Sequence, residues 1–320
     1  MGMGSLSIPV WREKWHKREM ILGYGDYRYE LVKGWGKGPK NYTLGYASGV
    51  ATDSRERVYV VDREPTPAIA VFDREGNFLK AWGQGVFKIP HEIWIGPDDR
   101  VYITDAGDHT VRICTTEGKI LQVLGTVNQT APLGQPFCWP TRAVLSPKGE
   151  IYVSDGYKQN YVHRFSAEGK LLQTWGGQGS APGQFTLPHG ICVAPDGRVL
   201  VADREPNNRI QVFDPHGKFL AQWPGRLIPM ALHIDAQGIV YLAEGAGVSI
   251  FDLDGHLLSA FRVSGRPYDQ HHGVHGLWVD RHGDIYVGEV MTADLLWKFA
   301  RLPKAPPPAP PSYTRRPPPI

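Results

Sequence analysis

Three histidines recur at one fixed position of an internal repeat and could together hold a metal ion. They are His91, His189 and His275. Imidazoles that point at one axis suit Zn²⁺ and leave a fourth position open for water or substrate. The alternative is that histidines inside a channel only hydrogen-bond to one another or to water. A single histidine in a channel is more often of that kind than a metal ligand. Three histidines at the same position of the repeat are not explained as easily in that way, so the pattern favours a metal site.

Two arginines and a tyrosine follow the same repeat closely enough to stand near these histidines. Arg63 and Arg204 each come directly after an acidic residue that ends a strand, and Tyr157 follows another such residue. Arginine binds carboxylates through two parallel hydrogen bonds, so the pair indicates an anionic substrate. A tyrosine beside Zn²⁺ and arginine could have a lowered pKa and act as a base. The alternative is that both arginines only brace the blades by pairing with Asp62, Asp203 or neighbouring acids.

A repeat of four short strands must position these side chains. Each copy has an apolar strand, a Gly/Asp turn, a strand that ends in Asp or Glu, a further strand and a second glycine turn. At a fixed distance before each acidic strand end lies one position of the first strand. Through the six copies, this position is occupied by Ser48, His91, Thr141, His189, Met230 and His275.

Four strands in roughly 40–50 residues, repeated along the chain, are typical of a β-propeller. The sequence therefore predicts an all-β, six-bladed propeller over residues 29–302, in which the recurring position forms a ring around the central channel. The sixth copy has only three clear strands, and an N-terminal strand at 29–36 would complete it and close the ring. Residues 1–28 are expected to form an N-terminal arm, and residues 303–320 a proline-rich disordered tail.

Composition restricts the class of protein further. The chain has 320 residues, of which 42% are hydrophobic and 21% charged, with a net charge of +3. These values are typical of a soluble globular protein and do not indicate nucleic acid binding. No apolar run is long enough for a membrane helix or a signal peptide, so we expect a cytoplasmic protein, without a membrane partner and monomeric. The cysteines form no obvious disulfide framework, which also suits a reducing compartment.

Several motifs resemble one family of NHL-repeat propellers, peptidyl-α-hydroxyglycine α-amidating lyase. They read FKIPHEIWI, FCWPTRAVL with VSDGY, FTLPHGICV, ADREPNNRIQVF, and VHGLWVD with IYVGE, and the resemblance spans about residues 49–302. It implies a zinc ion on the three histidines, a catalytic tyrosine at Tyr157, and active-site arginines at Arg63 and Arg204. It also implies cleavage of a C-terminal α-hydroxyglycine into a peptide amide and glyoxylate.

The chain departs from this family at two places. The last histidine lies in Gly273-Val274-His275-Gly276 instead of Met-Pro-His-Asp, so the aspartate connected with the family's structural calcium is absent. Cys138 matches a cysteine that the family pairs in a disulfide, but the position of its partner is Lys158 here. The resemblance therefore implies zinc, but neither this disulfide nor a clear calcium site.

The resulting hypothesis is a zinc-dependent lyase that cleaves the C–N bond of an α-hydroxyglycine-like carbinolamide in a small molecule or peptide bearing a carboxylate. Two other classes remain open. A metal-dependent hydrolase of the lactonase type would need a calcium site with carboxylate and asparagine ligands, whereas the ring position offers no carboxylate. A propeller that binds protein or RNA would need a basic or apolar exposed face, and would have no need of three aligned histidines.

Overall fold

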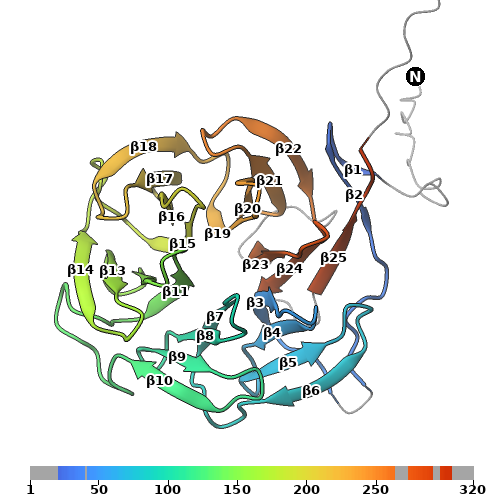
Figure 1. Ribbon diagram of the computed structural model, residues 1–320, viewed down its shortest axis with the longest axis horizontal. Coiled ribbons are helices and arrows are strands. Elements are labelled where there is room, and N and C mark those ends of the chain that lie inside the picture. The colour runs from blue at the N-terminus through green and yellow to red at the C-terminus, as the bar shows by residue number, and fades with distance from the viewer. Residues whose placement is uncertain (1–20, 40–41, 264–272, 291–295, 305–320) are drawn as a thin grey trace, which may run out of the picture.

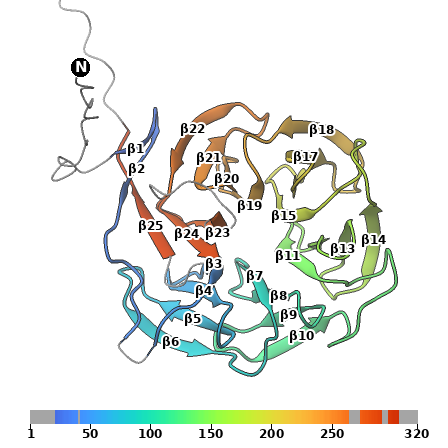
Figure 2. The ribbon, with the colours of Figure 1, turned by 180° about the vertical axis from the view of Figure 1, so that it is seen from behind.

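Six antiparallel sheets surround a central axis as the blades of a propeller (Figure 1), and the view from behind shows the same closed ring (Figure 2). The structure is a computed structural model that describes residues 21–39, 42–263, 273–290 and 296–304. The first strands of successive blades contact one another around the axis, and the last of them contacts the first. The predicted all-β, six-bladed fold is therefore confirmed. Within the described ranges, no helix has the length and apolar character needed to cross a membrane.

The strands of each blade follow one another in sequence from the axis outwards, and blade six also includes two N-terminal strands. Blade one comprises β3 (Ala47–Thr52), β4 (Val58–Asp62), β5 (Ala68–Phe72) and β6 (Phe78–Trp82). Blade two comprises β7 (Pro90–Ile95), β8 (Val101–Asp105), β9 (Thr110–Cys114) and β10 (Ile120–Leu124). Blade three comprises β11 (Pro140–Leu145), β12 (Ile151–Asp155), β13 (Tyr161–Phe165) and β14 (Leu171–Gly176). Blade four comprises β15 (Pro188–Val193), β16 (Val199–Asp203), β17 (Arg209–Phe213) and β18 (Phe219–Pro224). Blade five comprises β19 (Pro229–Ile234), β20 (Val240–Glu244), β21 (Gly247–Phe251) and β22 (Leu257–Arg262). Blade six comprises β23 (Gly273–Val279), β24 (Ile285–Val290) and β25 (Leu296–Arg301), followed outwards by the N-terminal strands β2 (Tyr27–Leu31) and β1 (Leu22–Tyr24).

The second strand of a blade is largely apolar and buried, because neighbouring blades cover both of its faces. In β4 and β16 every residue is buried, whereas the outermost strand β18 is mostly exposed.

Adjacent blades are held together by a repeated contact between a hairpin glycine and a tryptophan of the preceding blade. Gly217 has a φ of 73°, and a Cβ atom there would lie 2.6 Å from the Trp175 ring. Both the turn and the close approach therefore require glycine at this position.

The ring is closed by strands from both ends of the chain, as predicted, but the N-terminal strand is shorter than expected. Strand β2 spans Tyr27–Leu31 rather than residues 29–36, and it pairs with β25 on one side and with β1 on the other. The residues after Leu31 leave the sheet because Trp35 packs inward, with its ring centroid 5.2 Å from Tyr286 and 5.8 Å from Phe72. Residues 21–28 lie in or beside this sheet, so they are not an arm, and the rest of the expected arm and most of the tail lie outside the described residues.

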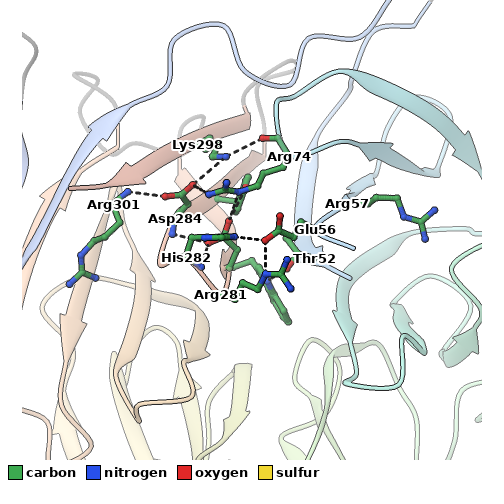
Figure 3. A network of polar contacts seen from close by, with 12 residues as sticks. Thr52, Glu56, Arg57, Arg74, Arg281, His282, Asp284, Lys298 and Arg301 are labelled. Carbon is green, nitrogen blue, oxygen red and sulfur yellow. Dashed lines mark hydrogen bonds and ion pairs between the residues drawn. The ribbon is translucent and has the colours of Figure 1, made fainter. Parts of the chain in front are cut away.

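A polar network fastens blade six to blade one at the same junction (Figure 3). The carboxylate of Asp284 accepts hydrogen bonds from Arg74 Nη2 at 3.0 Å and from the Arg301 backbone N–H at 2.9 Å. Lys298 Nζ lies 3.3 Å from the same carboxylate and donates to the Arg74 carbonyl oxygen at 3.0 Å. One buried carboxylate therefore joins the C-terminal strands to the hairpin between β5 and β6.

We expect Asp284→Ala to destabilise the protein by about 2–4 kcal/mol, because it leaves Lys298 without its buried carboxylate and removes one of the two carboxylates beside Arg74. Asp284 and Lys298 are only 9% and 8% exposed. Arg281 belongs to the same network but is 66% exposed, so Arg281→Ala should cost less than about 1 kcal/mol. Urea denaturation measures both values. Equal midpoints for the two variants would show that the Asp284 contacts do not fasten the ring.

Candidate metal centre

The three predicted histidines meet at the axis, near the first residues of β7, β15 and β23. All three are buried, and the centroids of their rings are 4.7–4.9 Å apart. The strand register shifts at each of these positions, for example between Pro90 and Glu92. Such a bulge takes one residue out of the ladder and re-aims its side chain. The repeat therefore directs one imidazole from every second blade into the channel.

Backbone contacts fix the orientation of each imidazole. Nδ1 faces a carbonyl oxygen of the next blade and donates its proton there, which leaves the Nε2 lone pair unprotonated. The carbonyl in each case belongs to the residue at the same recurring position of the following copy. The pairs are His91 with Thr141 at 2.7 Å, His189 with Met230 at 2.8 Å, and His275 with Ser48 at 2.6 Å.

The charge state of the cluster suits a metal ion. Burial lowers the pKa of all three imidazoles, and the nearby arginines add to this effect, so that the pKa of His275 falls to about 3. Neutral imidazole is the form that coordinates metals. One nitrogen from each ring lies within 4.8 Å of the others, and His275 Nε2 has no hydrogen-bond partner among the described residues. Three neutral nitrogen donors, one of them buried and unpartnered, fit a bound metal such as zinc.

Tyr157, two residues beyond the end of β12, places its hydroxyl group against this cluster. Its Oη atom lies 2.9 Å from His91 Nε2 and 3.1 Å from His189 Nε2. Burial raises the pKa of Tyr157, while the positive charges of Arg204 and Arg63 act in the opposite direction. The pKa of Tyr157 was expected to be lowered, but the protein groups alone raise it. The loss of hydration on burial has a larger effect than the positive charges of the two guanidiniums. A cation held by the histidines would act in the same direction as the arginines.

The two arginines are close enough to the cluster to influence its charge, but they have different partners. Arg204 is 14% exposed and forms a two-point contact with Glu205, with Nη2–Oε1 at 2.8 Å and Nε–Oε2 at 3.0 Å. The Nε atom of Arg63 is buried and has no hydrogen-bond partner in the described part of the chain. A buried guanidinium N–H without a protein partner is costly unless a water or a ligand accepts its hydrogen bond, so Arg63 Nε is a position where a ligand can bind.

The alternative in which the arginines pair with acids is met for Arg204, whose partner is the neighbouring Glu205, whereas Asp62 and Asp203 have other partners. Asp62 accepts a hydrogen bond from the Tyr42 hydroxyl at 2.6 Å, and Asp203 pairs with Arg209 at 3.1 Å. The acidic strand ends therefore anchor the loops and strands of their own blades. This leaves the buried Nε of Arg63 available to a ligand, whereas the Nε and Nη2 atoms of Arg204 are already bonded to Glu205.

Sequence reasoning missed a buried charged pair beside the histidines. Glu92 and Arg142 directly follow the recurring position in blades two and three, and Arg142 Nη1 lies 3.6 Å from Glu92 Oε2. Burial raises the pKa of Glu92 to about 7 against the opposing effect of Arg142. A carboxylate is thus present just beyond the ring, although the ring position itself offers none. The signal was available, because the other blades have small residues there: Gly49, Gly190, Ala231 and Gly276.

Aromatic and basic groups that were also missed stand beside Tyr157. The Trp139 ring lies 6.4 Å from that of Tyr157, and Lys158 Nζ lies 5.5 Å from the centroid of Trp139. Cys138 is a free thiol next to this tryptophan, and Lys158 stands at the position of the family's second cysteine. Trp139 thus lies next to Tyr157, and Lys158 lies over the Trp139 ring.

The chain is similar to several known proteins in sequence. Residues 185–213 match the NHL repeat. Peptidyl-glycine alpha-amidating monooxygenase of Mus musculus is 29% identical over 202 residues, which cover 53% of this chain and 20% of that protein. NHL repeat-containing protein 3 of Homo sapiens is 36% identical over 178 residues, covering 52% and 51%. A probable peptidyl-alpha-hydroxyglycine alpha-amidating lyase of Caenorhabditis elegans is 32% identical over 128 residues, covering 39% and 37%.

Solved structures with the same fold are more distant in sequence. A gluconolactonase from Xanthomonas campestris superposes with a TM-score of 0.64 at 15% identity and covers 86% of this chain and 90% of its own. An inactive virginiamycin B lyase from Staphylococcus aureus, bound to quinupristin, gives 0.60 at 12% identity, with 86% and 100% covered. At these identities the likeness shows the propeller fold alone. The alignments span about a fifth of the mouse monooxygenase and about half of the human protein.

Proposed function

Starting from an NHL-repeat propeller related to the amidating lyases and to NHL repeat-containing protein 3, we propose that this chain is a zinc-dependent lyase. It cleaves the C–N bond of an α-hydroxyglycine-like carbinolamide and releases an amide and glyoxylate or a related aldehyde. The observation that carries the proposal is the convergence of three unprotonated Nε2 atoms beside the hydroxyl of Tyr157. That arrangement places a cation site and a proton acceptor together.

The residues that would hold zinc are His91, His189 and His275, each with its Nδ1–H already bound to a carbonyl. When bound, a zinc ion supplies a Lewis acid that lowers the pKa of a hydroxyl group beside it. The backbone carbonyls of Thr141, Met230 and Ser48 keep the three donors in place, as outer partners of metal ligands do in general.

Tyr157 is the group placed to move the proton. In its phenolate form, which the positive charges of Arg63 and Arg204 favour, it accepts the proton of the substrate hydroxyl. The electrons of that O–H bond form the carbonyl of the aldehyde, and the electron pair of the C–N bond goes to nitrogen. Tyr157 then returns the proton to the nitrogen, so the amide leaves neutral and no further reactant is consumed.

The arginines hold the carboxylate of the substrate. Arg63 contributes a buried N–H that has no partner among the described residues, and Arg204 is held in a fixed direction by Glu205. Guanidinium groups match a carboxylate in shape as well as in charge. Because the carboxylate is attached to the reacting carbon, fixing it also orients the hydroxyl group towards Tyr157.

We expect Arg204→Ala to raise KM about 10–100-fold for a substrate with a free carboxylate, the loss typical of a charged hydrogen bond. The corresponding carboxamide should be affected much less, because it carries no charge for the guanidinium to bind. Steady-state kinetics with both compounds separate these effects. Arg198 lies in the turn at the other end of its blade, so Arg198→Ala is the matched control. An equal loss for both substrates would show that Arg204 does not recognise the carboxylate.

The test of the proposed function is elemental analysis of the purified protein, followed by incubation with α-hydroxyhippurate. We expect close to one zinc ion per chain, formation of benzamide and glyoxylate in equal amounts, and loss of turnover with a chelator that zinc restores. A protein without transition metal and without turnover would contradict the proposal. It would favour the alternative of a propeller that binds protein or RNA on one face.

A further inference from the structure

A cavity of 510 Å³ lies at one end of blade five, away from the histidines but on the same face of the propeller. Its wall includes Glu244, the last residue of β20, and Arg204 follows the corresponding end of β16 in blade four. The cavity therefore opens on the face that carries Arg204 and Tyr157. The residues used below are, from its lining, Arg226, Leu227, Val248, Ser249, Ala260 and Phe261.

In blade four, the connection before the first strand fills the space that is open in blade five. Residues 177–187 contact β17, and Phe185 of this connection is fully buried against Phe213. The carbonyl of Gln184 accepts hydrogen bonds from Arg209 Nη2 at 2.9 Å and from Gln211 Nε2 at 2.7 Å. Gln222 Oε1 accepts a further bond from Arg209 at 2.9 Å. Three long polar side chains thus hold the connection down.

Blade five lacks both the connection and the side chains that would hold it. Only residues 225–228 join β18 to β19. The strand register pairs Ser249 with Ala260 in blade five where it pairs Gln211 with Gln222 in blade four, and Gly247 stands in the place of Arg209. Small residues replace long ones at all three positions. Three small residues in place of long ones therefore open the cavity, although Arg262, in the place of Pro224, also lines it.

The chemistry of the cavity indicates an apolar group with a polar acceptor next to it. Leu227, Val248 and Phe261 supply apolar wall, and ligand pockets of about this volume commonly take such groups. Arg226 is exposed at the edge and makes no hydrogen bond or ion pair with a described residue. The Glu244 carboxylate is already occupied, because it accepts bonds from Ser249 Oγ and the Leu227 N–H.

We propose that this cavity is a subsite for an apolar side chain on the amide-nitrogen side of the substrate. The inference rests on the proposed function, since it takes the substrate to be a peptide that extends outwards over blade five. Adjacent strands are about 4.8 Å apart, so the cavity reaches roughly 14 Å outwards from β19. At about 3.3 Å per extended residue, some four residues cover the distance from β19 to the outer end of the cavity.

The test uses N-acetylated alanine peptides that end in α-hydroxyglycine and carry one phenylalanine at each successive position. We expect kcat/KM to rise roughly 10–100-fold when phenylalanine lies at one position, about four or more residues from the reacting end, as burial of one aromatic side chain allows. The corresponding peptide amides should show the same optimum in equilibrium binding measured by calorimetry.

Three variants test where the optimum comes from. Ala260→Trp fills the cavity and should abolish the preference, and Ala260→Gln should reduce it with little strain, because Gln222 occupies that place in blade four. Leu257→Gln changes an exposed residue of the same strand outside the cavity and should leave the preference intact. A flat profile, or an optimum that persists in Ala260→Trp, would overturn the subsite. If peptide binding depends on Ala260 but no turnover occurs, the subsite is supported and the lyase activity is contradicted. If turnover occurs but does not depend on the position of phenylalanine, the lyase activity is supported and the subsite is contradicted.

Discussion

Replacing His189 by alanine is expected to remove the bound metal and to lower turnover by roughly 10³-fold or more. Metal catalysis contributes several kcal/mol to lowering the barrier, and a catalytic zinc site needs three protein ligands. His189 supplies one of only three donors in the described cluster. Metal content and activity should therefore fall together when they are measured on the same preparation.

The propeller should stay folded in this variant, because the five apolar clusters of the blades do not depend on the histidines. Circular dichroism and the melting temperature check that point. Met230→Leu is the matched control, since Met230 stands at the next position of the ring and its side chain is apolar. That variant should retain the metal. Full metal content in His189→Ala would show that the ion binds elsewhere.

Tyr157→Phe is expected to lower kcat by roughly 10²–10⁴-fold, the range for a positioned general base, with KM almost unchanged. The substitution keeps the aromatic ring and removes only the hydroxyl group that lies between His91 and His189. Metal content should stay at the wild-type level, because no imidazole is altered. Steady-state kinetics and elemental analysis of the same sample therefore separate the loss of a base from the loss of the ion.

Tyr152→Phe provides the control for removing a buried hydroxyl group. Tyr152 lies at the other end of β12, and its hydroxyl donates to the Pro215 carbonyl oxygen at 3.0 Å. Its removal should cost about 1 kcal/mol of stability and leave kcat unchanged. A fully active Tyr157→Phe protein would contradict the proposed mechanism without affecting the description of the fold.

The sequence was sufficient to predict the ring of histidines because one strand position repeats in every blade. Equal position in a repeat means equal height along the axis, so His91, His189 and His275 had to converge once the propeller closed. The bonds from their Nδ1 atoms could not be predicted, since the acceptors are backbone carbonyls and any residue supplies one. The orientation of each imidazole depends on how far the neighbouring blade is rotated, which the spacing does not show.

Features that depend on contacts between blades were the ones the sequence did not give. The sequence predicts a strand at residues 29–36 that completes the sixth copy, but the burial of Trp35 against Tyr286 ends the strand at Leu31. The Glu92–Arg142 pair joins two blades through residues that neighbour the ring position. The cavity of blade five is visible only when two blades are compared strand by strand, because the short connection and the small side chains act together.

The bonds from the histidines to the carbonyls have a consequence for cooperativity. Each histidine belongs to one blade and is bonded to the next, so the three of them touch all six blades. An ion held by all three imidazoles would therefore link all six blades, because the separation of any blade would disturb its coordination. By mass action, a ligand present at 100 times its Kd adds about 2.7 kcal/mol to the stability of the form that binds it. The junction between β2 and β25, where only non-covalent contacts join the two ends of the chain, would thereby be stabilised from a distance, by an amount that grows with the logarithm of the free metal concentration.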